Sequence, residues 1–234
     1  MPPALILLIV LSALLLAAAI LPWPIIGRWK RRRAALVASY AAEHGWDYRP
    51  SAPDLAKRFG QVPFGVGFSA KVENVLLGTQ AGRPVAVFDY HYYYRGTLGP
   101  TSGGSRWYTV VAVSLGTGVP DVAINPAGLK YVMFSRHRDL ETGDAAFDKA
   151  FAVATKTPDF ARDVLVPGVR EVLLRHLDSA WRFDGDSLLM ISPLAIARAP
   201  ALEEERLADA VRVPDQVPAQ VWERLRAFDP REPG

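Results

Sequence analysis

The chain has 234 residues and a mass of 25.6 kDa, and half of its residues are apolar, which suits one or two compact domains. It contains no cysteine, so disulfide frameworks, thiolate nucleophiles and cysteine-based metal clusters are excluded. The net charge of +3 is smaller than the five positive charges within residues 28–33, so the remainder is close to neutral and gives little support to nucleic-acid binding.

The N-terminus carries a long apolar stretch. Residues 4–21, ALILLIVLSALLLAAAIL, contain Ser12 as their one polar side chain, and PWPII extends the stretch to residue 26. At about 1.5 Å per residue, such a helix crosses a hydrocarbon core of roughly 30 Å, so the pattern predicts a transmembrane helix over residues 4–26. A cleaved secretory signal is the alternative. No basic residue precedes the stretch, however, and the stretch exceeds the usual apolar length of about 7 to 15 residues.

A basic cluster follows this stretch, and aromatic residues flank the junction. Positive residues beside a span stay in the cytoplasm, and tryptophan rings favour the headgroup level. The sequence therefore predicts a single-pass plasma-membrane protein with its N-terminus outside and its C-terminal domain in the cytoplasm. Anionic lipid is an optional ligand of the basic cluster. The predicted membrane-interface residues are Trp23, Arg28, Trp29, Lys30, Arg31, Arg32 and Arg33.

The rest of the chain predicts an α+β domain with an antiparallel sheet and packed helices. Residues 28–45 have the spacing of a juxtamembrane helix that ends at Gly45. Residues 46–134 contain four β-branched and aromatic runs, AKVENVLLGTQ, RPVAVFDYHYYY, WYTVVAVSL and DVAIN, separated by turn residues. This arrangement predicts an antiparallel β-meander with short helices, one of which begins at Pro126.

Residues 144–229 form the second half of the predicted domain structure. AFDKAFAVAT predicts a strand, because large apolar residues alternate in it, and TPDFARDVLV and PGVREVLLRHLD predict helices. WRFDGDSLLMIS predicts a hairpin, and ALEEERLADAVRV and PAQVWERLRAF predict terminal amphipathic helices. Strands followed by helices and then more strands indicate α+β organisation. This half forms either its own domain or one domain with residues 46–134.

Three segments carry a resemblance to a known group of proteins. They are RRRAALVASYAAEHGWDYRP, GRPVAVFDYHYYY and AFDKAFAVATKTPDFARDVLVPGVREVLL. Together they resemble actinobacterial membrane-anchored proteins that carry a cytoplasmic domain of unknown function. The resemblance covers most of the chain after Trp29 and implies the same single-anchor architecture. It brings no activity, cofactor or catalytic residue with it.

The sequence contains only weak motifs for catalysis or for binding of a cofactor or metal. GVGFSAK lacks the spacing of a phosphate-binding loop, and the four histidines are far apart with no pair at helical spacing, so we predict no cofactor and no metal site. The best catalytic candidates are Asp89 and His91 in FDYHYYYR, because a strand places both on one face and a carboxylate beside an imidazole can act as a general base. The simpler interpretation is that the tyrosines pack across strands and the Asp–His face has no nucleophile to activate.

The sequence therefore favours a non-catalytic, membrane-tethered cytoplasmic interaction or accessory module. Its expected partners are the membrane and another protein, and nucleic acid is not expected. Two alternatives remain open: a membrane-associated enzyme that uses the Asp89/His91 face, and a module that binds anionic lipid through the basic cluster.

Overall fold

The computed structural model describes residues 22–96, 103–127, 140–193 and 200–227. Within these residues, eight strands form one antiparallel sheet in the order β1-β2-β3-β4-β8-β7-β5-β6. The strands are β1 (Asp47–Ser51), β2 (Phe68–Gln80), β3 (Arg83–Tyr94), β4 (Gly104–Ser114), β5 (Val122–Pro126), β6 (Phe151–Thr155), β7 (Ala180–Asp184) and β8 (Ser187–Pro193). The helices are α2 (Pro22–His44), η1 (Leu55–Arg58), α3 (Ala145–Ala150), α4 (Pro158–Val164), α5 (Pro167–Leu174), α6 (Pro200–Gln216) and α7 (Ala219–Ala227).

The sheet joins strands from both halves of the chain. Strands β2, β3 and β4 form the predicted meander, and the predicted β7–β8 hairpin turns at Gly185, whose φ is +62°. The fourth run of the predicted meander, β5, does not pair with β4. Strand β8 occupies that edge of β4, and β5 lies between β7 and β6 instead.

The predicted transmembrane architecture is corrected by the structure. No helix within the four described stretches of the chain is both long enough and apolar enough to cross a membrane. Residues 4–21 of the predicted span lie outside the described residues, and residues 22–26 belong to α2, which runs on through the basic cluster. The predictions of a single-pass fold class and of a plasma-membrane location with a cytoplasmic domain are therefore wrong on this finding.

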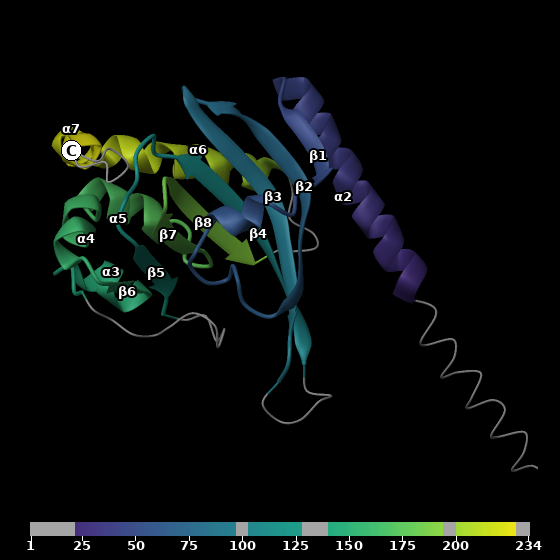
Figure 1. Cartoon of the computed structure of the whole chain (residues 1–234), viewed down its shortest axis with the longest axis horizontal. Helices are drawn as coiled ribbons and strands as arrows, with labels where there is room; N and C mark the ends of the chain where they lie inside the picture. Colours follow the sequence, from purple (N-terminus) through teal and green to yellow (C-terminus); the bar gives the residue numbers. More distant parts are fainter. Residues whose placement is uncertain (1–21, 97–102, 128–139, 194–199, 228–234) are drawn as a thin grey trace, which may run out of the picture.

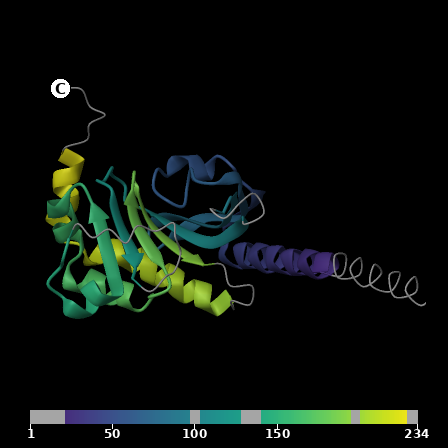
Figure 2. The ribbon, with the colours of Figure 1, turned by 90° about the horizontal axis from the view of Figure 1, so that it is seen from below.

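Helix α2 ends as the sequence predicts. Gly45 has φ +66°, and the Trp46 amide donates to the Ala41 carbonyl at 2.8 Å, which is the hydrogen bond of a Schellman cap. Pro22 and Pro24 lie in its first turn, where a missing amide donor costs little. Figures 1 and 2 show α2 lying along the β1–β2 side of the sheet and projecting from the body of the molecule at its N-terminal end.

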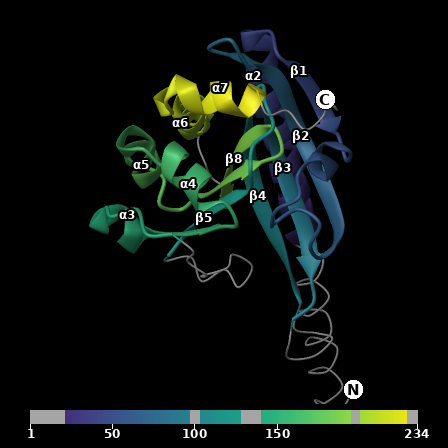
Figure 3. The same cartoon turned by 60° about the vertical axis from the view of Figure 1, so that its left-hand side comes forward.

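Helices cover one face of the sheet and a loop covers the other. Helices α3 to α7 pack on the face that carries Val111, Trp181 and Met190, and α2 lies on the same side (Figures 2 and 3). The opposite face buries alternate side chains of β3 and β4 beneath Phe59 and Phe64, from the segment that carries η1. The sheet therefore has two apolar cores, one on each side.

Two local predictions fail for identifiable reasons. AFDKAFAVAT is not one strand: Asp144 accepts hydrogen bonds from the amides of Ala146 and Phe147, and this N-cap starts α3 before the chain extends into β6. Pro126 does not begin a helix, because it is the last residue of β5. Residues 128–134 of that predicted helix lie outside the described residues.

Candidate functional site

Strand β3 presents two chemically different faces. Phe88, Tyr90 and Tyr92 are buried in the core beneath the η1 segment, whereas Asp89 and His91 lie on the side that α2 covers. This alternation is the one that the sequence predicts for an extended strand. The two candidate catalytic residues therefore do share a face, and the question is what surrounds them.

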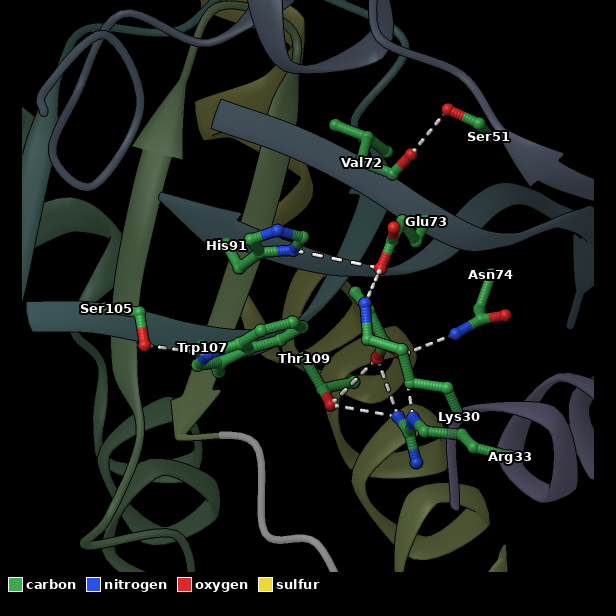
Figure 4. Close-up of polar contacts among 11 residues, drawn as sticks. Lys30, Arg33, Ser51, Val72, Glu73, Asn74, His91, Ser105, Trp107 and Thr109 are labelled. Atoms are coloured by element: carbon green, nitrogen blue, oxygen red, sulfur yellow. Dashed lines mark hydrogen bonds and ion pairs between the residues drawn. The ribbon is translucent and has the colours of Figure 1, made fainter. Parts of the chain in front are cut away.

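Asp89 holds helix α2 on the sheet. The Arg33 guanidinium donates from Nε to Oδ2 at 2.7 Å and from Nη2 to Oδ1 at 2.6 Å, so the contact is bidentate (Figure 4). Asn74 Nδ2 donates to Oδ2 at 2.9 Å, and the Thr109 hydroxyl lies 3.4 Å from Oδ1. Asp89 is 3% exposed, so both of its oxygens are buried and already accept hydrogen bonds. We call Arg33, Asn74, Asp89 and Thr109 the helix-docking site.

A β-bulge aims Asn74 at this site. The register of β2 against β3 shifts between Glu73 and Leu76, and Asn74 has φ +52° within that shift. Asparagine tolerates this left-handed conformation better than most residues. The bulge brings the Asn74 amide within 2.9 Å of Asp89, although the two residues are on different strands.

His91 is a packed imidazole. Its ring stacks on Trp107 with a centroid separation of 3.9 Å and an interplanar angle of 18°, and the residue is 2% exposed. Nδ1 lies 3.8 Å from Glu73 Oε2, and Lys30 Nζ lies 3.4 Å from the same oxygen. Burial lowers the pKa of His91, and Lys30 and Lys71 act in the same direction, whereas Glu73 and Asp89 raise it. The lowered pKa favours a neutral ring at pH 7.

A row of buried and half-buried polar side chains crosses the sheet under α2 and α6. Its members are in register across neighbouring strands, so their side chains share one face. Arg33 of α2 donates to the Thr109 hydroxyl at 3.3 Å, and Arg206 of α6 donates to the hydroxyls of the last two members at 2.7 and 2.8 Å. The row consists of Glu73, Asp89, Thr109, Ser192 and Ser179.

No hydroxyl nucleophile accompanies either buried histidine. A second acid–imidazole pair joins α6 to the residues that follow α5, where His176 Nε2 lies 2.8 Å from Asp209 Oδ2 and Arg175 also contacts Asp209. Within the described stretches, no serine or threonine hydroxyl hydrogen-bonds to His91 or His176. Nor do these stretches contain a group of three or more metal-binding side chains. The polar contacts of Asp89 and Asp209 join elements of the fold to one another.

The predicted membrane-interface residues have different surroundings. Lys30 and Arg33, one helical turn apart, face the sheet and pair with Glu73 and Asp89. The other three cations of the cluster are exposed on α2 and have no ion-pair partner in the described part of the chain. Those cations are Arg28, Arg31 and Arg32. Trp23 and Trp29 belong to α2, but their side chains are not among those that the structure describes.

Four residues that contribute to these contacts are not predicted from the sequence. They are Glu73, Asn74, Trp107 and Thr109. The one usable signal was the pair of cations at positions 30 and 33, because residues three apart lie on the same side of a helix and need acceptors if that side is covered. A strand with an acidic residue on its polar face offers such an acceptor.

Comparison with known proteins identifies a fold and no family. No protein-family model matches the chain, and no curated protein matches it significantly. Among solved structures, the chain is similar to the mycobacterial trehalose monomycolate transport factor A, TtfA, with a TM-score of 0.52 and 20% sequence identity. The match covers 88% of this chain and 98% of that one. The neighbour is mycobacterial, and therefore actinobacterial, and at this identity the likeness concerns the fold alone.

Proposed function

We propose that this protein is a non-catalytic accessory module that binds a protein partner in a transport process. Its fold resembles that of a mycobacterial transport factor over 88% of the chain. The same likeness supports a distant relationship to actinobacterial proteins, the group that the sequence segments resemble. The transport process itself is inferred from the neighbour's name and belongs to the proposal.

The observation that carries the proposal is that both oxygens of the Asp89 carboxylate already accept hydrogen bonds. A general base needs a free lone pair within reach of a substrate proton. Both oxygens of Asp89 accept hydrogen bonds from Arg33, and Asn74 donates a further one. Asp89 itself is 3% exposed. His91 is stacked on Trp107 and is equally buried. This arrangement supports a structural role for the Asp–His face and weighs against the enzyme alternative.

Complementation of a strain that lacks this chain tests the proposal. His91→Gln removes the titratable ring, and loss of a general acid or base typically lowers activity by about 10²- to 10⁴-fold. The accessory role predicts that this variant restores the phenotype at wild-type protein abundance, as the control His44→Gln should, since His44 is exposed at the end of α2. Loss of complementation in His91→Gln alone, with unchanged abundance and melting temperature, would establish the enzyme alternative.

A further inference from the structure

One end of the sheet exposes aromatic side chains next to cations. Phe68 of β2 and Tyr93 of β3 are 49% and 42% exposed, and their rings stack with centroids 6.1 Å apart. His91 continues the line edge-on to Tyr93 at 6.3 Å and stacks on the half-buried Trp107. The result is a continuous aromatic line across three strands.

Three cations flank this aromatic line. Arg95 Cζ lies 5.7 Å from the centroid of the Phe68 ring, and Lys30 Nζ lies 5.0 Å from that of the Trp107 ring. Lys71 is exposed and is the register partner of His91, which puts its side chain on the same face. We call the group Phe68, Tyr93, Trp107, Lys30, Lys71 and Arg95 the aromatic–cationic patch.

A second β-bulge produces this arrangement. Phe68 and Lys71 are three residues apart, so in a regular strand their side chains would point to opposite faces. Their partners Tyr93 and His91 are two apart, and the extra residue of β2 is accommodated where Ser69 has φ +53°. The bulge therefore turns an aromatic and a cation to the same side, as bulges beside binding sites often do.

The charge of the patch is not balanced within the described chain. Glu73 is the nearby carboxylate, and it already lies 3.4 Å from Lys30. Lys71 and Arg95 have no carboxylate partner among the residues the structure describes. The sequence contains no acidic residue between Asp89 and Asp121. Exposed cations that lack partners attract acidic groups, and exposed aromatic rings gain from covering by apolar side chains.

We propose that the aromatic–cationic patch binds an acidic segment of a partner protein that carries an aromatic or aliphatic anchor. The anchor would cover Phe68 and Tyr93, and the carboxylates would pair with Lys71 and Arg95. A nucleic acid fits less well, because it needs an extended basic surface and the sequence has no excess of positive charge outside residues 28–33. The inference rests on the proposed accessory function and names the class of its partner.

Selection from a random displayed-peptide library on the full chain tests this inference. We expect enriched peptides that combine several acidic residues with an aromatic or aliphatic one. Synthetic copies should bind by fluorescence anisotropy and weaken by about tenfold with Lys71→Glu/Arg95→Glu, which corresponds to about 1.4 kcal/mol. Phe68→Ser should weaken binding similarly, since it removes apolar contact.

Matched variants control for total charge and for exposed apolar area. Lys57→Glu/Arg162→Glu makes the same charge change at exposed sites, and Leu177→Ser removes an apolar side chain that is 56% exposed. Both controls should bind the peptides as the wild type does. Enrichment of peptides without acidic residues, equal binding by patch and control variants, or tighter patch-dependent binding of oligothymidylate or phosphatidylglycerol vesicles would each overturn the inference. If His91→Gln does not complement the strain while the peptides still bind the patch, the proposed accessory function is wrong but the inferred peptide-binding surface is retained.

Discussion

Arg33→Met removes the residue that fixes α2 on the sheet. It leaves the Asp89 carboxylate, whose side chain is 5% exposed, without its charged partner. Removing one member of a buried ion pair costs about 3–5 kcal/mol. Asn74 and Thr109 still donate to Asp89, and α2 can move aside to admit water, so we expect the free energy of unfolding to fall by about 2–3 kcal/mol.

Asp89→Asn should cost less than Arg33→Met. The Arg33 side chain is 15% exposed, so its guanidinium can turn towards water once the carboxylate is gone. We expect a loss of about 1–2 kcal/mol. The double variant should cost less than the sum of the two single variants by about 1–2 kcal/mol, because each single change already breaks the contact.

Urea denaturation of the four proteins measures this coupling, and amide hydrogen exchange locates it. In both single variants the amides of α2 should exchange faster than they do in the wild type. The amides of β3 should change less, because α2 opens first. Arg32→Met is the matched control, since Arg32 is exposed on the same helix and should change stability by less than about 0.5 kcal/mol. If the effects of Arg33→Met and Asp89→Asn add within about 0.5 kcal/mol, or if α2 exchange is unchanged, Asp89 does not hold the helix.

Three further predictions concern pH and packing. Burial lowers the pKa of His91 below its value of 6.5 in the unfolded chain, so stability should fall as the pH drops below 6.5, and His91→Gln should remove that part of the acid dependence in denaturation curves. Burial raises the pKa of Tyr90 from 10.0 to about 12, so the folded state favours the neutral phenol; stability should fall from about pH 10 upwards, and Tyr90→Phe should flatten this limb. A Cβ at Gly78 would overlap the Trp46 ring, so Gly78→Ala should lower the free energy of unfolding by about 1–3 kcal/mol, and an unchanged denaturation midpoint would contradict that packing.

Local patterns predicted much of the sheet. The alternation in FDYHYYYR, the turn residues DGD and the glycine after α2 each depend on neighbouring residues, and the structure has the faces, the hairpin and the helix end that they indicate. The position of β5 was missed because strand order depends on pairings between distant segments. Nothing in DVAIN indicates that β8, more than sixty residues later, takes the neighbouring place beside β4.

The shared face of Asp89 and His91 could be predicted from the sequence, but the contacts that surround these residues could not. Asp89 and His91 were placed correctly on one face, but the partner of Asp89 lies 56 residues away in the sequence. The five cations of the basic cluster lie within six consecutive positions, so they form a single feature of the sequence. A helix sorts adjacent residues onto different sides, so Lys30 and Arg33 face the sheet while Arg32 faces solvent.

Charged contacts contribute to the position of α2, because few of its described side chains are buried. Within α2, Ala41 is the one buried residue among those whose side chains are described, and Leu36 is 56% exposed. Helix α6 differs, since Leu207, Val211 and other apolar residues of this helix are buried in the core. Arg206 adds hydrogen bonds to these apolar contacts. A slip of one residue in α2 would shift Arg33 by about 1.5 Å and rotate it by about 100°, which would leave Asp89 buried and without its charged partner. The ion pair therefore favours the register that the cap at Gly45 and the start of β1 at Asp47 set at the other end of the helix.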